Sequence, residues 1–83
     1  NIYPNPAFDN ISLDISNNDT FIVTYSLILY DKLGRNIFIN NITLKPSEKR
    51  NFKIDMSKFE SGLYLLSVLK NGNPLEKKKI IKY

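Results

Sequence analysis

Two residue types on which much protein chemistry depends, cysteine and histidine, are missing from the chain. Without cysteine there are no disulfides, thiolate metal ligands or cysteine nucleophiles. Without histidine the commonest general base and the commonest metal ligand are also missing. The eight carboxylates fall mostly in predicted turns or at strand ends, with no spacing that enforces a catalytic pair. The sequence therefore favours a domain that is not an enzyme, and we expect no metal and no cofactor.

Glycine and long apolar runs are also scarce. The three glycines lie far apart, which excludes a glycine-rich phosphate loop. No run of 18 apolar residues occurs, so no membrane-spanning helix is expected. The first residue is Asn1 rather than Met, and no signal peptide is visible. We expect residues 1–83 to be a single domain excised from a larger secreted protein.

The charge is positive but unevenly distributed. The net charge is +4, and lysine supplies ten of the twelve basic residues. The only dense basic group is Lys77, Lys78 and Lys79 with Lys82, whereas acidic residues are scattered through the chain. Nucleic-acid binding requires a basic face on a recognisable module, so we do not expect a nucleic-acid partner.

Short apolar or alternating segments separated by turn residues dominate the sequence. Strands are predicted at residues 10–15, 20–30, 36–44, 51–55, 63–70 and 75–82. In the longest segment one face carries Phe21, Val23, Tyr25, Leu27 and Leu29, and the other is partly apolar too, as in a central strand. A helix over 57–69 is rejected because Gly62 interrupts it and no 3.6-residue stripe exists. The predicted fold is all-β: a small immunoglobulin-like antiparallel β-sandwich of about six to seven strands.

Two turns have clear local signals. Asp31 and Gly34 suit a hairpin in which Gly34 takes a positive φ angle. Asn71-Gly72-Asn73-Pro74 is the strongest hairpin signal, because Asn-Gly readily adopts the positive φ angles of a two-residue turn.

The ten aromatic residues allow two interpretations. Most lie within alternating strand patterns, which favours packing in the core and across strands. An exposed aromatic face could instead bind sugars. The alternative function is therefore an immunoglobulin- or fibronectin-like accessory module that binds carbohydrate or protein on a cell-surface enzyme, through exposed aromatics such as Tyr25 or Tyr30.

Four segments, in order and spacing, resemble one known family. The first is Ile2-Tyr3-Pro4-Asn5-Pro6 and the second runs from Leu29 to Arg35. The third has two parts, Ile54–Ser57 and Ser61–Val68, and the fourth is Lys79–Lys82. Together they resemble the C-terminal sorting domain of the type IX (Por) secretion system, over essentially the whole chain. The family-motif residues that we interpret as structural are Tyr3, Pro4, Asn5, Pro6, Asp31, Gly34, Arg35, Gly62 and Tyr64.

Each motif also has a physical interpretation. The two prolines of the first motif fix φ and favour extended neighbours, which suits a boundary between linker and domain. Gly62 indicates a backbone conformation, or a close approach, that a side chain would forbid. Tyr64 is expected to anchor the core while its hydroxyl reaches a polar partner.

The basic C-terminal end has two compatible interpretations. Lysines on an edge strand protect a sheet against aggregation. The secretion machinery could also bind this end directly, and for that role we select Lys77, Lys78, Lys79, Ile80, Ile81, Lys82 and Tyr83.

The resemblance implies a function as a C-terminal sorting signal. A passenger domain would precede this domain in the same chain, and type IX translocon components would carry both across the outer membrane. A sortase-like cysteine peptidase would commonly remove the domain and anchor the passenger to the surface or release it. The source would be a Gram-negative bacterium of the Bacteroidetes group, and the location secreted or at the cell surface. Because sandwich edges can pair or exchange strands, we also expect a homodimer at high concentration.

Overall fold

The computed structural model, which describes residues 2–3 and 9–83, consists of strands joined by turns. In chain order they are β1 (Ile2–Tyr3), β2 (Asn10–Ser16), β3 (Val23–Asp31), β4 (Asn36–Leu44), β5 (Lys49–Asp55), β6 (Gly62–Lys70) and β7 (Asn73–Lys82). The predicted all-β sandwich is confirmed. Residues 57–61 form turns before β6, so the rejection of a helix over 57–69 is confirmed as well. No helix in the described part of the chain could cross a membrane.

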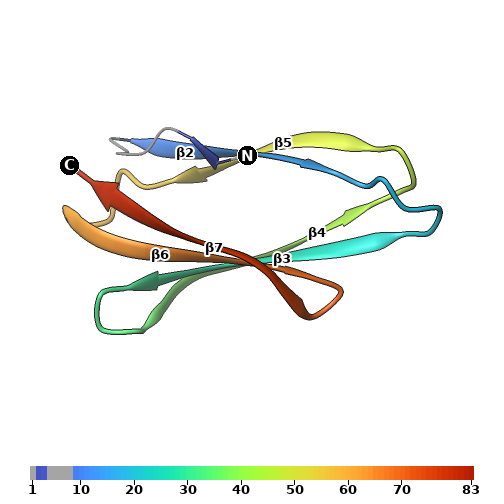
Figure 1. Cartoon of the computed structure of the whole chain (residues 1–83). Coiled ribbons are helices and arrows are strands. Elements are labelled where there is room, and N and C mark those ends of the chain that lie inside the picture. Colours follow the sequence, from blue (N-terminus) through green and yellow to red (C-terminus); the bar gives the residue numbers. More distant parts are fainter. Residues whose placement is uncertain (1, 4–8) are drawn as a thin grey trace.

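The strands form two antiparallel sheets stacked as layers (Figure 1). One sheet has the order β1-β2-β5 and the other has the order β4-β3-β6-β7. In the larger sheet β3 pairs with β4 on one side and with β6 on the other. This central position confirms the inference from the apolar residues on both faces of β3. The edges of the larger sheet are β4 and β7.

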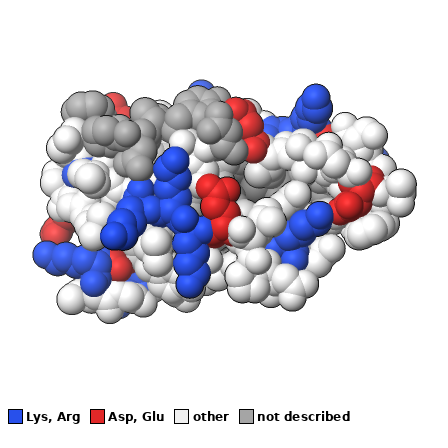
Figure 2. All heavy atoms as spheres, in the orientation of Figure 1, with Lys and Arg blue, Asp and Glu red and all other residues white. Residues whose placement is uncertain are grey.

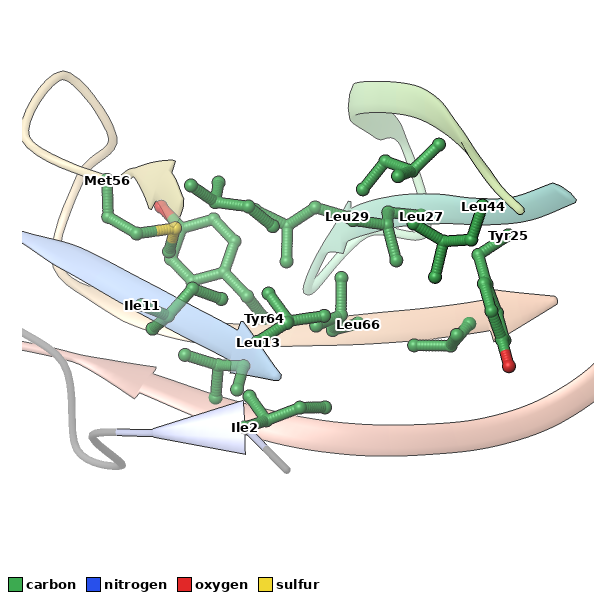
Figure 3. Close-up of a cluster of buried hydrophobic side chains, with 14 of the residues drawn as sticks. Ile2, Ile11, Leu13, Tyr25, Leu27, Leu29, Leu44, Met56, Tyr64 and Leu66 are labelled. Carbon is green, nitrogen blue, oxygen red and sulfur yellow. The ribbon is translucent and has the colours of Figure 1, made fainter. Parts of the chain in front are cut away.

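The core lies between the two layers (Figure 3). Alternation along β3 directs Val23, Tyr25, Leu27 and Leu29 inward, and each is at most 7% exposed. The register places Leu27 opposite Val68 and Leu29 opposite Leu66, so β6 continues the same apolar surface. The smaller sheet covers that surface with buried residues that include Ile11, Leu13 and Ile54. Burial of this kind is the main favourable term in folding.

The start of β3 differs from the prediction. The strand begins at Val23 rather than at residue 20, and Phe21 and Ile22 are 57% and 60% exposed. The physical reason is Asn17, whose amide donates to the Phe21 carbonyl at 2.8 Å while its Oδ1 accepts the Asp19 N–H at 2.9 Å. These bonds fold the connection into a turn, so the apolar alternation of residues 20–22 has no strand to join.

Asn17 also joins two loops at one end of the sandwich. Its side chain is 1% exposed and donates to the Leu44 carbonyl at 3.0 Å. Its backbone N–H donates to the Glu48 carbonyl and its carbonyl accepts the Ser47 N–H, both at 2.9 Å. A buried amide costs free energy unless its polar atoms are bonded, and here each of them is.

The two predicted hairpin turns are present. Gly34 has φ 82°, and Asn71 and Gly72 have φ 50° and 83°, as a two-residue turn with two positive φ angles requires. Asn71 also ties its turn to β3, because it exchanges two hydrogen bonds with Thr24. The β6–β7 hairpin is therefore fixed by local sequence and docked by one side chain.

Candidate recognition surface

β7 forms an edge of the four-stranded sheet and carries most of the residues selected for recognition. Among the strands that the structure describes, it pairs with β6 alone, from Gly62 opposite Lys82 to Lys70 opposite Asn73. Pro74 lies near its beginning, and the register shifts between Val68 and Leu69 on the partner strand. Proline, a bulge and lysines are all devices that protect an edge strand from pairing with other chains.

The register divides the selected segment between two faces. Lys77, Lys79 and Ile81 lie opposite Ser67, Leu65 and Leu63, which belong to the outer face of the sheet. On the other face, Ile80 lies opposite Tyr64 and is 0% exposed, so it belongs to the core. Lys78 lies opposite the buried Leu66, yet it keeps partial exposure at the rim of the sandwich. Tyr83 is 61% exposed, whereas Lys82 is partly buried.

A groove of about 650 Å³ runs along the outer face beside β7. Its lining is mostly apolar and includes Ile28, Tyr30, Leu65 and Leu69. Lys32, Lys77 and Lys79 also line it, together with Asp31 and Gly34 of the turn after β3. An apolar floor with basic side chains at its margin fits a partner that is apolar and acidic. Neither the composition nor the motifs indicated this groove.

Basic side chains dominate the surface around β7. Figure 2 shows Lys and Arg side chains gathered on the face of the molecule that carries this strand. None of the ion pairs that join described residues includes Lys77 or Lys78. The positive potential of this edge is therefore available to steer an acidic partner toward it.

The turn after β3 is built around the Asp31 carboxylate. It accepts the N–H groups of Arg35 and Leu33, at 3.0 and 2.9 Å, and the Arg35 Nε at 2.7 Å. Gly34 donates its N–H to the Asp31 carbonyl at 3.0 Å. The backbone N–H of Arg35, followed by its guanidinium and the Leu33 N–H, holds the pKa of Asp31 below its usual value. Asp31, Gly34 and Arg35 thus belong to one turn, which an ion pair and hydrogen bonds to Asp31 hold together.

Gly62 and Tyr64 begin β6 beside this turn. Gly62 has φ 149°, and a Cβ there would meet no atom within 4 Å. Of the two predicted reasons for glycine, backbone conformation therefore applies and close approach does not. Tyr64 is 7% exposed and its hydroxyl donates to the Glu60 carbonyl. Burial, with a smaller contribution from the charges of Glu60 and Asp31, raises the pKa of Tyr64.

Strand pairing brings three distant motif segments to one end of the sandwich. Asp31 lies opposite Tyr64 across β3 and β6, and Tyr64 lies opposite Ile80 across β6 and β7. Figure 1 shows the Asp31–Arg35 turn, the start of β6 and the C-terminus at the same end. Spacing along the sequence could not show this, because the segments are joined only by the order of strands in the sheet.

The opening motif is described only in part, at the strand β1 (Ile2–Tyr3). The backbone of Tyr3 pairs with Ser12 of β2, whereas Pro4, Asn5 and Pro6 are not described. Their interpretation as a boundary between linker and domain stays a prediction.

The alternative function, binding of carbohydrate or protein through exposed aromatics, named Tyr25 and Tyr30, and only Tyr30 lies on the outer face. Tyr25 is 7% exposed, and its hydroxyl donates to the Ser16 carbonyl at 2.9 Å, so its expected exposure was wrong. Its ring is buried because the inward face of β3 continues to this residue. Tyr30 lies on the outer face and lines the groove, in a partly buried position.

These features define a small antiparallel β-sandwich with a structured, basic C-terminal edge. The family model described as "Secretion system C-terminal sorting domain" matches residues 1–82, and the chain belongs to this family. The domain is therefore a C-terminal sorting signal of type IX secretion, a role that implies a passenger protein and export to the cell surface or beyond it through the outer membrane. No curated protein matches the chain significantly.

Proposed function

We propose that the outer-membrane translocon of the type IX system recognises the folded end of the domain at which the three motif segments meet. The observation that supports this is the convergence of the Asp31 turn, the start of β6 and the basic β7 strand beside one apolar groove. On this proposal the motif residues shape the surface and the lysines of β7 provide its charge. The sorting signal is then a three-dimensional surface rather than a linear peptide.

Truncation alone is a poor test of this proposal. Deleting residues 79–83 is expected to leave a fusion protein in the periplasm, but it also removes Ile80 from the core. A folding defect and a recognition defect would then look the same. Substitutions that keep the fold separate the two.

The sharper test neutralises two lysines beside the groove. In the double variant Lys77→Gln and Lys79→Gln, a passenger fusion is expected to accumulate in the periplasm while its melting temperature stays unchanged. The matched control is Lys49→Gln and Lys53→Gln on β5, which removes the same charge from an edge of the other sheet. Surface display of the first variant at wild-type level, or an equal loss of display in the control, would refute recognition through β7.

After transport, we propose that a sortase-like cysteine peptidase removes the domain near the segment that precedes Asn1. The passenger is then attached to anionic lipopolysaccharide or released. Mass spectrometry of the mature passenger is expected to show a new C-terminus upstream of Asn1. A surface passenger that still carries residues 1–83 would contradict this step.

The isolated domain is also proposed to form a homodimer at high concentration. Light scattering across a wide concentration range tests this, and monomer mass throughout would exclude it. The edges of the larger sheet differ enough to predict which of them pairs.

A further inference from the structure

β4 is the second edge of the four-stranded sheet, and it differs in kind from β7. It spans nine residues, Asn36–Leu44, and it contains no charged residue and no proline. It pairs with β3 along one side, and no strand within the described ranges lies along the other. Ile39 on this strand is 58% exposed. A long edge without charge or proline is a template for another strand.

Two hydrogen bonds identify the peptide groups that face the open side. The Asn41 N–H donates to Oδ1 of its neighbour Asn40 at 3.0 Å instead of to β3. Thr43 lies opposite Thr24, whose N–H and carbonyl both bond to Asn71 on the far side of β3. Peptide groups alternate in direction along an antiparallel strand. Those of Ile39, Asn41 and Thr43 therefore point outward, away from β3.

Charge argues for a second copy of the chain at this edge and against pairing at the others. β5 carries Lys49, Arg50 and Lys53 against one acidic residue, Asp55, and β7 carries four lysines against one acidic residue, Glu76. Self-pairing of either strand would bring two strands of net positive charge together, which is unfavourable. Two molecules of net charge +4 approach best where neither presents charge. Of the long edge strands that the structure describes, β4 is the one that meets this condition.

The sequence of β4 is compatible with its own antiparallel copy. When Asn40 lies opposite Asn40, all nine residues pair, from Asn36 opposite Leu44 onward. Phe38 then lies opposite Ile42 twice, both on the core side of the sheet, because they align with the buried Leu29 and Tyr25. Apolar and aromatic cross-strand pairs stabilise such ladders.

We infer that β4 pairs antiparallel with β4 of a second copy, about a two-fold axis at Asn40. The two four-stranded sheets then form one continuous sheet of eight strands, through an interface that closes after two molecules. This assignment refines the homodimer proposed above, and it does not depend on how the translocon reads β7.

Cross-linking tests the axis directly because the natural chain has no cysteine. Asn40 is expected to form a non-hydrogen-bonded pair with its copy, with Cα atoms about 4.5 Å apart, within the range of a disulfide. Asn40→Cys should therefore give a covalent dimer on mild oxidation at high concentration. The control, Asn73→Cys on the exposed beginning of β7, should stay monomeric. Equal cross-linking of both variants, or of neither, would overturn the inference.

Charge provides a second test. Asn41→Lys places a lysine at the proposed interface, and Asn73→Lys adds the same charge to the β7 edge. Light scattering should show that Asn41→Lys shifts the dimer to at least tenfold higher concentration, while Asn73→Lys dimerises about like wild type. Equal melting temperatures would show that both variants fold. Unchanged dimerisation of Asn41→Lys, as expected for exchange of β7, would refute the β4 interface, and so would monomeric wild type.

The same variants distinguish this inference from the proposed sorting function. Asn41→Lys should leave export of a passenger fusion at wild-type level, because β7 and its groove are unchanged. The double variant Lys77→Gln and Lys79→Gln should still dimerise. Normal export of the double variant would refute recognition through β7, and normal dimerisation of Asn41→Lys would refute the β4 interface. Each proposal can therefore fail without the other.

Discussion

The two edges of the larger sheet, β4 and β7, are built on different principles. β7 carries four lysines and Pro74, and a residue on its core face is fully buried. β4 carries no charge and leaves Ile39 exposed at its middle. One edge is therefore protected against strand pairing and suited to attract an acidic partner, whereas the other is suited to pair with itself. A single sheet can offer two separate interfaces because its edges differ in charge.

The largest expected difference between the edges concerns two isoleucines. Ile80 of β7 is 0% exposed and Ile39 of β4 is 58% exposed. Ile80→Ala should lower the free energy of unfolding by about 2–4 kcal/mol, because it leaves a cavity in the core. Ile39→Ala should change it by less than about 0.5 kcal/mol. Urea denaturation of both variants measures this, and similar losses would mean that the core face of β7 and the outer face of β4 do not differ in burial.

A smaller effect is expected where β4 ends. The Asn17 amide holds the carbonyls of Phe21 and Leu44. Asn17→Ala should cost about 1–3 kcal/mol, because it removes hydrogen bonds to the buried Leu44 carbonyl and to the Phe21 carbonyl. The matched control is Asn41→Ala, which removes an exposed asparagine side chain from β4. Its free energy of unfolding should stay within about 0.5 kcal/mol of wild type. If thermal unfolding gave equal midpoints for the two, Asn17 would not join the loops energetically.

The smallest effect concerns the turn that precedes β4. Hydrogen bonds lower the pKa of Asp31 in the folded state, so the ionised carboxylate stabilises the fold above the ordinary Asp pKa of about 4. This contribution is lost as the pH falls through the lowered pKa. Wild type should therefore melt above Asp31→Asn at neutral pH, and the two melting temperatures should converge in acid. A gap that stays constant with pH would show that the charge is not what stabilises the turn.

Local signals in the sequence predicted much of this fold. Residues 36–44 are rich in β-branched and aromatic residues and form β4 with the predicted bounds, and Asn71-Gly72 forms the expected turn. The predicted beginning of β3 at residue 20 was wrong, because hydrogen bonds to one buried side chain, Asn17, fold residues 17–21 into a turn. The groove beside β7 could not be predicted, because it depends on the order in which β3, β6 and β7 pair.

The residues predicted for recognition fall into a buried and an exposed group, and the sequence could not show this because it depends on how the sheets pack. Alternation along β7 distinguishes one face from the other, but it cannot show that the face with Ile80 meets the core while its neighbours Lys78 and Lys82 remain at the rim. That outcome depends on how far the smaller sheet extends over the larger one. Asp31, Tyr64 and Ile80 carry no sequence signal of their proximity, yet pairing aligns them across three strands.

The hydrogen bond between Asn40 and Asn41 has a kinetic consequence. Within one molecule the Asn40 side chain already occupies an N–H that a second strand would take. In the single molecule the Asn41 N–H therefore has a hydrogen-bond acceptor. When two molecules meet, this bond has to open before the two β4 strands can pair. Association is expected to be slower than the diffusion of two neutral surfaces would allow. Molecules that pass through a compartment quickly or at low concentration would then cross it alone, while those that accumulate at one place have time to pair.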